Sequence, residues 1–383
     1  MTKDDLKIGI ALSGGGVRAA VFHLGILGRL AEDSLLEKVK YLSTVSGGTL
    51  VTGLIYSIAE NRWPASDFFL RECLIQARRY LTQTNIQLGA ILRVITQPRL
   101  LLGKRLKSIS KSIQKSWKIS ESLNDIPPEP RWILNATTYE SGRNWQFIPQ
   151  GWMGEDVTNY VEKPSIPLTD AMAASAAYPI LIGPLVLDTK NFRWFQFQEQ
   201  RREESQAQFR KLHLWDGGVY DNLGLEGLYD IENQEYKGDY DFLVISDASD
   251  PIEIEQHSRW FWKRMDRVLA VMIDQARILR SRILMNHFES HGNSGVYFEI
   301  GNTAREILET IETDEGLDEE LIDELTRNTL SMKQAKDAED FKTTLWRLEE
   351  AEYDLLYRHG WETANFTLQA RCPDIFQHME WNG

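Results

Sequence analysis

The first sixty residues alternate between strand-like and helix-like segments, and this alternation restricts the possible folds most strongly. Two short apolar runs, 7–12 (KIGIAL) and 39–43 (VKYLS), are typical of buried strands. Each is followed by a stretch with apolar residues at helical spacing, 17–32 and 48–60. This order predicts a βαβ unit and a parallel sheet, in which sites lie at the carboxyl ends of the strands.

A glycine-rich loop and a serine stand at those two predicted strand ends. The loop Ser13–Gly16 follows the first strand and Ser46 follows the second, so adjacent parallel strands would bring them together. A serine on a sharp strand-to-helix turn with small neighbours is typical of a nucleophile elbow, which exposes the hydroxyl. Gly48 matches the second glycine of that pattern, whereas Thr44 stands where the first is expected. The alternative role for Ser46 is a plain turn or helix cap.

The glycine loop has two interpretations. Gly14, Gly15 and Gly16 precede a predicted helix and offer bare backbone N–H groups to an anion, as in the oxyanion hole of acyl transfer. The same glycines also fit the loose dinucleotide-binding pattern G-x-G-x-x-A, with Asp33 near the position of a ribose-binding acid. Arg18 would orient the loop or contact a substrate phosphate, and its alternative place is an ordinary helix surface.

A serine nucleophile needs a base, and none of the seven histidines stands in a motif that would make it one. His23 lies on an apolar helix and is expected in the core. His213 is near a second candidate, Asp216, which precedes Gly217 and Gly218 in the run LWDGGVYDNLG. An Asp-Gly pair is also common in plain turns, so this segment alone does not decide between the two roles.

The overall composition excludes several classes of protein. A net charge of −13 and a pI near 5.2 argue against a dedicated nucleic-acid binder. Cys73 and Cys372 form neither a disulfide framework nor a metal spacing, and the acidic segment 306–324 lacks the spacing of a calcium loop, so no metal or cofactor is expected. The first ten residues do not resemble an export signal, and no apolar run reaches about 18 residues, which favours a cytoplasmic location.

Four blocks, in this order, resemble the patatin-like phospholipase family: SGGGVR, TVSGG about thirty residues later, AMAASAAYPILIGPL at 171–185, and WDGG downstream. A fifth run, YDFLVISDAS at 240–249, is similar to the strand that follows the Asp-Gly-Gly turn in bacterial members. The resemblance implies a three-layer α/β/α fold with a mainly parallel central sheet, and a Ser–Asp dyad without histidine. It assigns Ser46 as nucleophile and Asp216 as base, with Gly14, Gly15 and Gly16 as oxyanion loop and Arg18, Gly48, Gly217 and Gly218 in support.

This resemblance implies a lipid acyl hydrolase, similar to a phospholipase A, that acts on phospholipids or other acyl esters. Two alternatives stay open. One is a catalytically weak or silent member that binds a lipid or a partner. The other is an acyltransferase, because water and another alcohol compete for the same acyl-enzyme.

A basic segment suggests how such a protein would meet a membrane. Residues 81–120 contain eight Lys or Arg and no acid, and 102–118 has a helical pattern. Its apolar side carries Leu102, Leu106, Ile109, Ile113 and Trp117, and its basic side carries Lys104, Lys107, Lys111, Lys115 and Lys118. This pattern predicts peripheral contact with an anionic membrane. A core-packed helix with a solvated lysine face is the alternative.

The chain 1–383 is expected to form one domain, with a catalytic core at 5–250 and a mostly helical part at 251–383 packed on it. The pattern predicts a strand at 131–139, a long helix at 260–288 and a strand at 295–300. It then predicts an acidic, solvated helix-loop-helix surface at 306–324, a helix at 340–359 and a closing segment at 359–368.

Overall fold

Five parallel strands form the centre of the fold, in the order β14-β13-β1-β2-β3. The computed structural model describes residues 3–96, 105–179, 182–198, 201–252, 254–311 and 318–381. The central strands are β1 Ile8–Leu12, β2 Val39–Thr44, β3 Arg131–Thr138, β13 Phe242–Asp247 and β14 Gly295–Glu299. Every residue of β1 and β13 is buried, so both faces of this sheet need a cover.

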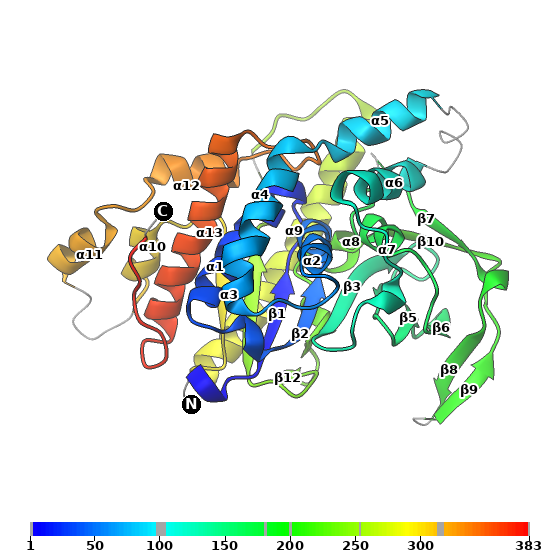
Figure 1. The fold of residues 1–383 in the computed structure, drawn as a ribbon, viewed down its shortest axis with the longest axis horizontal. Helices are drawn as coiled ribbons and strands as arrows, with labels where there is room; N and C mark the ends of the chain where they lie inside the picture. The colour runs from blue at the N-terminus through cyan, green and yellow to red at the C-terminus, as the bar shows by residue number, and fades with distance from the viewer. Residues whose placement is uncertain are drawn as a thin grey trace.

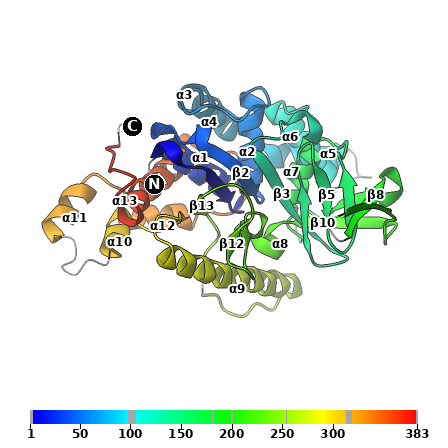
Figure 2. The same cartoon turned by 90° about the horizontal axis from the view of Figure 1, so that it is seen from below.

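Helices supply that cover on both faces (Figure 2). One face carries α1 Gly16–Glu32, α2 Gly47–Ile58, α4 Leu74–Gln83 and α13 Glu350–Arg371. The other carries α8 Gly218–Asp221 and α9 Phe261–Ser290. The expected three-layer α/β/α fold is therefore confirmed, as are the first two strand–helix pairs to within two residues at each end.

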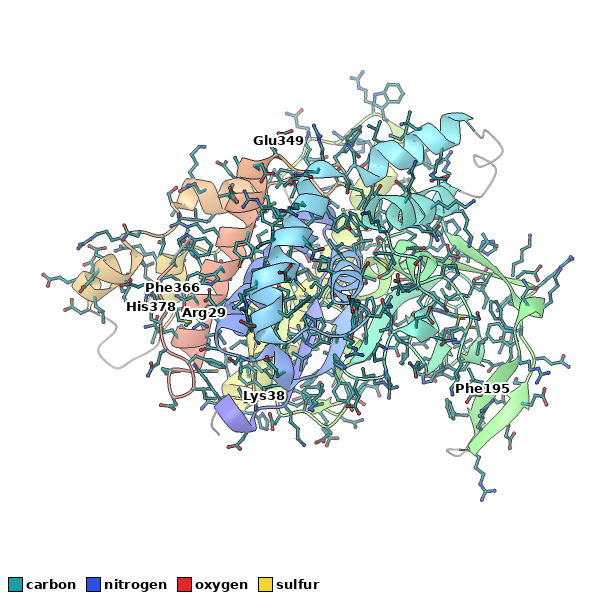
Figure 3. All side chains as sticks on the ribbon, viewed as in Figure 1. Arg29, Lys38, Phe195, Glu349, Phe366 and His378 are labelled. Carbon is teal, nitrogen blue, oxygen red and sulfur yellow. The ribbon has the colours of Figure 1, made fainter. Side chains whose placement is uncertain are left out.

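Beyond β3 the sheet becomes antiparallel, which the sequence patterns did not predict. Its further strands are β4 Asn144–Phe147, β5 Trp152–Glu155, β6 Asn159–Glu162, β7 Leu185–Asp188, β8 Trp194–Gln198, β9 Arg201–Ser205 and β10 Lys211–Asp216. The hairpin of β8 and β9 projects from the body, and Phe195 marks it in Figure 3. The strand β10 pairs with β3, so Asp216 is opposite Ala136. This half of the sheet therefore carries the predicted base to the sheet centre.

Apart from short 3-10 turns, the remaining elements lie around the sheet (Figure 1). They are α3 Ser66–Phe68 with the π-helical turn Phe69–Cys73, α5 Ile86–Thr96, α6 Arg105–Trp117, α7 Leu168–Ser175, α10 Ala304–Glu309, α11 Glu319–Thr326, α12 Met332–Glu339, and the strand pair β11 Tyr229–Asp230 and β12 Glu235–Tyr236. Within the described ranges, no helix combines the length and the apolar character needed to cross a bilayer.

The basic helix α6 packs its apolar side into the core. Leu106, Ile109, Ile113 and Trp117 are buried, whereas Lys107, Lys111 and Lys115 are exposed, and Lys107 pairs with Asp170. Leu102 and Lys104 lie outside the described residues. For the described residues, the structure therefore supports the alternative of a core-packed helix with a solvated lysine face, and Trp117 is not available for the predicted membrane contact. Lysine contact with a membrane surface stays a prediction.

The carboxyl-terminal part corrects the predicted boundaries. The long helix and the following strand are confirmed as α9 and β14. The helix predicted at 340–359 is confirmed only from Glu350, where α13 begins, and α13 continues through the predicted closing segment. Glu349, labelled in Figure 3, precedes α13, and its N–H donates to the Glu352 carboxylate at 2.8 Å. Upstream, the Leu348 N–H donates to the Leu81 carbonyl at 3.0 Å, so a tertiary contact holds this segment outside the helix.

Glycines allow α13 to lie directly against α1. A Cβ added to Gly25 would overlap the Tyr357 carbonyl oxygen, and one added to Gly360 would overlap the Phe22 carbonyl oxygen. Farther along the same interface, Arg29, which is labelled in Figure 3, donates to the Asn365 side chain at 2.8 Å. The carboxyl-terminal helix therefore forms part of the core.

Gly360→Ala should lower the free energy of unfolding by about 2 kcal/mol or more, because the added methyl group meets backbone that cannot rotate away. Urea unfolding measures this change. The control is Gly292→Ala, which has no atom within 4 Å of the added Cβ and should change stability by about 0.5 kcal/mol at most. Equal stability of both variants would contradict the close packing.

Candidate active site

The glycine loop and Ser46 meet at the carboxyl ends of β1 and β2. These strands pair in parallel with Leu12 opposite Thr44, so the segments that follow them emerge side by side. A Cβ added to Gly14 would lie 3.3 Å from the Ser46 Cβ. The sequence prediction that these two segments come together is confirmed.

Ser46 adopts a strained backbone conformation, with φ 47° and ψ −112°, between β2 and α2. A non-glycine residue in such a region costs roughly 1–3 kcal/mol and persists only where the surroundings enforce it. Gly47 and Gly48 make the turn possible, because a Cβ added to Gly47 would overlap the Gly16 carbonyl and one added to Gly48 would lie 2.5 Å from the Leu12 carbonyl. This is the geometry of a nucleophile elbow, and the Ser46 side chain is only half-buried.

Thr44 fits the elbow although the pattern has glycine there. Its hydroxyl accepts from the Trp132 indole at 2.9 Å and hydrogen-bonds to the Thr49 hydroxyl at 2.9 Å. The side chain therefore points into a polar contact below the turn. Threonine in place of the glycine of G-x-S-x-G therefore leaves no buried hydroxyl without a hydrogen bond at this turn.

Asp216 ends β10 and is buried beside Ser46. Its carboxylate accepts the Gly218 N–H at 2.8 Å. Burial raises the pKa of Asp216 from its ordinary 3.8 to about 7, and the hydrogen bonds from Gly218 and the Ser46 hydroxyl offset part of that rise. Asp216 is therefore a carboxyl that takes and releases a proton near neutral pH.

Ser175 connects the two turns, and the sequence analysis assigned it no role. Its hydroxyl accepts the Ser46 N–H at 3.0 Å and hydrogen-bonds to the Thr49 hydroxyl at 2.8 Å. Its carbonyl accepts the Gly217 N–H at 3.2 Å, and the Ala177 carbonyl accepts the Asp216 N–H at 3.1 Å. The signal was present in the small-residue run AMAASAAY, where a serine among alanines has room for such contacts.

Asn222 is a second residue that sequence reasoning missed. Its carbonyl accepts the Gly14 N–H at 3.0 Å, and its side chain donates to the Ser249 hydroxyl at 2.7 Å. A Cβ added to Gly14 would overlap the Asn222 amide oxygen, and one added to Gly218 would lie 2.5 Å from it. Asn222 therefore sets the spacing between the glycine loop and the Asp-Gly-Gly turn.

The glycine loop offers two N–H groups to an anion instead of the predicted three. The Gly14 N–H is already bonded to Asn222. Among the described residues, the N–H groups of Gly15, Gly16 and Gly47 donate no hydrogen bond. Gly15 and Gly16 have φ values of 140° and 63°, which glycine adopts most easily.

Arg18 is fully buried and holds the loop against the carboxyl-terminal part. Its guanidinium donates to the carbonyls of Ala248 at 2.8 Å, Glu339 at 3.0 Å and Phe341 at 2.8 Å, and pairs with Asp250. The structure supports the interpretation that Arg18 orients the loop, whereas a substrate-phosphate contact is wrong because protein groups surround the side chain. The surface-helix alternative is wrong for the same reason.

A dinucleotide site is excluded by the position of Asp33. This residue follows α1, which is 17 residues long, so it lies about 25 Å from the glycine loop. It pairs there with Arg29 and Lys3, both at 2.6 Å. A ribose-binding acid would have to stand at the carboxyl end of the next strand.

The histidines nearest in sequence to the site have other partners. His23 is buried in the core, as predicted, where it contacts the Ser246 hydroxyl at 2.7 Å and the Ser13 carbonyl at 3.0 Å. Burial lowers the pKa of His23 to about 4. The Nδ1 atom of His213 lies 2.6 Å from the Glu140 carboxylate. Neither ring contacts Ser46.

Asp216→Asn should raise the free energy of unfolding, because the buried charge is removed while the amide oxygen still accepts the Gly218 N–H. In the wild type, the unfolded carboxyl ionises above pH 3.8 and the folded one only above about 7, so folding stability falls across that window by roughly 4 kcal/mol in total. The gain should therefore be larger at pH 8 than at pH 5 in urea unfolding. A loss of stability that is equal at both pH values would contradict the raised pKa.

The comparison with known proteins covers the segments that carry these site residues. A family model described as patatin-like phospholipase matches residues 10–229, which is more than half of the chain. A patatin-like phospholipase domain-containing protein of Aspergillus clavatus is 24% identical over 217 residues, 56% of this chain and 26% of that protein. The cytosolic phospholipase A2 gamma of Mus musculus is 31% identical over 121 residues, 28% of this chain and 20% of that protein. The chain thus spans about a quarter or less of these relatives.

A solved structure agrees in fold. Human GIVD cytosolic phospholipase A2 superposes with a TM-score of 0.53 at 12% identity, covering 95% of this chain and 59% of that one. The same human protein in complex with methyl gamma-linolenyl fluorophosphonate and terbium chloride gives a TM-score of 0.51 at 13% identity, covering 96% and 59%. With the family model covering the glycine loop, the elbow and the Asp-Gly-Gly turn, the chain belongs to the patatin-like phospholipase family.

Proposed function

We propose that this protein is a lipid acyl hydrolase that cleaves acyl esters of phospholipids with a Ser46–Asp216 dyad. One observation carries the proposal: a serine on a strained elbow contacts a buried carboxyl whose pKa is raised to about 7. A general base is most effective when its pKa lies near the working pH. An ordinary aspartate would be too weak a base for a serine hydroxyl.

The proposed reaction has two halves. The Ser46 oxygen attacks the ester carbonyl carbon while its proton passes to Asp216, and the resulting oxyanion is held by the N–H groups of Gly15 and Gly16. Collapse of this intermediate breaks the ester bond, and Asp216 returns the proton to the leaving alcohol. Water then attacks the acyl-enzyme while Asp216 takes its proton. Collapse of this second intermediate releases the fatty acid, and Asp216 returns the proton to the Ser46 oxygen. No metal or cofactor takes part.

Supporting roles are assigned by contact. Ser175 and Asn222 position the elbow and the glycine loop, Arg18 holds that loop, and Gly47 adds a third unpaired N–H at the start of α2. We also infer that residues 1–383 act as one domain, since α13 packs on α1 and Arg18 binds carbonyls of the carboxyl-terminal part.

Ser46→Ala should lower ester hydrolysis on the order of 10³-fold or more, and Asp216→Asn should come close to that loss, because either change removes the proton transfer. The assay offers phospholipids, lysophospholipids and neutral glycerides and quantifies released fatty acid. A fluorophosphonate probe should label the wild type at Ser46. His213→Ala is the control and should keep activity within a few-fold.

Turnover of the Ser46→Ala variant at the wild-type rate would overturn the nucleophile assignment, and a several-hundred-fold loss in folded His213→Ala would replace the dyad by a triad. Acyl groups found on an added alcohol in preference to water would identify an acyltransferase. Lipid binding without labelling or turnover would identify a silent binding module.

The value of kcat/KM for a short soluble ester should rise with pH, and the midpoint of that rise should lie near pH 7, since Asp216 accepts a proton only when it is ionised. The profile is measured from pH 5 to 9 in buffers of constant ionic strength. A rate that is already flat above pH 5 would mean that the base keeps an ordinary carboxyl pKa.

A further inference from the structure

Residues 261–279 of α9 carry an apolar stripe that the described structure leaves largely exposed. The residues of this stripe recur at helical spacing and lie within about 60° of one another around the helix axis. They are Phe261, Met265, Val268, Met272 and Leu279, with exposed fractions of 53%, 40%, 51%, 65% and 60%. Between 261 and 273 no residue of the helix is buried, and Asp274 is the first. An amphipathic helix normally buries such a stripe against the rest of the protein. The exposed stripe of α9 therefore indicates a surface that contacts a partner.

Aromatic residues gather where the helix begins. Trp260 and Trp262 are 79% and 70% exposed and flank Phe261. Tryptophan and phenylalanine with an apolar stripe are typical of helices that lie in the interface of a bilayer, where the ring enters the headgroup boundary. Three consecutive exposed aromatics would otherwise favour aggregation.

The charge of this segment is opposite to that of the protein. Residues 256–272 contain four basic residues, Arg259, Lys263, Arg264 and Arg267, and one acid, Asp266, in a chain of net charge −13. The Asp266 carboxylate accepts the Tyr178 hydroxyl at 2.8 Å, and Lys263 lies 4.0 Å from Glu255. The local excess of positive charge complements an anionic surface.

The segment lies beside the proposed catalytic residues. Because β13 and β14 are parallel, α9 starts at the carboxyl end of β13, the end of the sheet that carries the glycine loop and Ser46. Tyr178, which binds Asp266, follows the Ser175 segment. Burial raises the pKa of Tyr178, and its hydrogen bond to Asp266 and the charge of Asp216 raise it further. Figure 1 shows α5 at the same end, where Leu88 and Ile91 are 41% and 42% exposed.

We propose that residues 260–272, the start of α9, are the surface on which this protein docks to an anionic lipid bilayer. Docking there would place the open end of the sheet against the membrane, so that an acyl ester reaches Ser46. This proposal rests on the proposed function and moves the membrane contact from α6 to α9. A second copy of the chain is a poorer occupant, because two such faces would bring their arginines and lysines together.

Two variants separate the apolar and the charged contributions. Trp260→Ser/Phe261→Ser/Trp262→Ser should weaken binding to vesicles of phosphatidylcholine and phosphatidylserine at least about tenfold, because the interfacial side chains are lost. Arg259→Gln/Lys263→Gln/Arg264→Gln should weaken binding to those vesicles and not to vesicles of phosphatidylcholine alone. Binding is measured by co-sedimentation with vesicles.

Matched controls come from other exposed surfaces. Leu321→Ser/Met332→Ser removes two exposed apolar side chains on α11 and α12, and Lys40→Gln/Arg201→Gln/Lys211→Gln removes three exposed charges. Both control variants should bind vesicles as the wild type does. Vesicle binding unchanged in the aromatic variant would overturn the proposal. The proposal would also be overturned if the wild type sediments as a dimer and the aromatic variant sediments as a monomer that still binds vesicles.

Failure of the docking surface and failure of the proposed function give different results. Hydrolysis of a short soluble ester reports on Ser46 alone, and the aromatic variant should keep it while losing hydrolysis of vesicle lipid. If the wild type binds vesicles through 260–272 but hydrolyses no ester, the docking surface stands and the hydrolase assignment falls. If both substrates are lost equally in a folded variant, the docking surface falls.

Discussion

The hydrogen bonds of Ser175 hold the candidate site together. Its hydroxyl accepts the Ser46 N–H and its carbonyl accepts the Gly217 N–H, so one residue joins the elbow to the Asp-Gly-Gly turn. Without such a connection, the strained backbone of Ser46 would relax, because a cost of roughly 1–3 kcal/mol needs opposing contacts. The proximity of Ser46 to Asp216 therefore depends on a third segment that carries neither proposed catalytic group.

The carboxyl-terminal part completes the same site from the other side. The Val17 N–H at the start of α1 donates to the Thr344 carbonyl at 3.0 Å, and Arg18 binds the carbonyls of Glu339 and Phe341. The Thr343 hydroxyl donates at 2.6 Å to Asp250, the ion-pair partner of Arg18. These contacts place the segment between α12 and α13 against the glycine loop, which explains why it is not helical. A change in this segment would thus reach the glycine loop directly.

Local patterns predicted well wherever a segment's environment follows from its own residues. The strands and helices of the first sixty residues and β14 are such cases, since their apolar residues match the faces that they bury. The helix α9 was predicted from its helical spacing alone, although much of its apolar stripe faces solvent. The antiparallel strands beyond β3 were missed because short amphipathic strands and turns differ little from loops in a single sequence. The start of α13 was misplaced because a backbone contact from Leu348 to Leu81 overrides helix propensity.

The sequence by itself determined the βαβ start of the fold and the turn that requires Gly47 and Gly48, because both depend on residue types at short spacing. The candidate pair of Ser46 and Asp216 came from the resemblance of its motifs to the patatin-like phospholipase family. Only the tertiary structure decided that Asp216 is buried enough for its pKa to reach about 7, since that burial comes from strands distant in the chain. It also decided that the apolar stripe of α6 faces the core and that of α9 faces solvent. Two amphipathic helices look alike in sequence, and only their packing partners distinguish them.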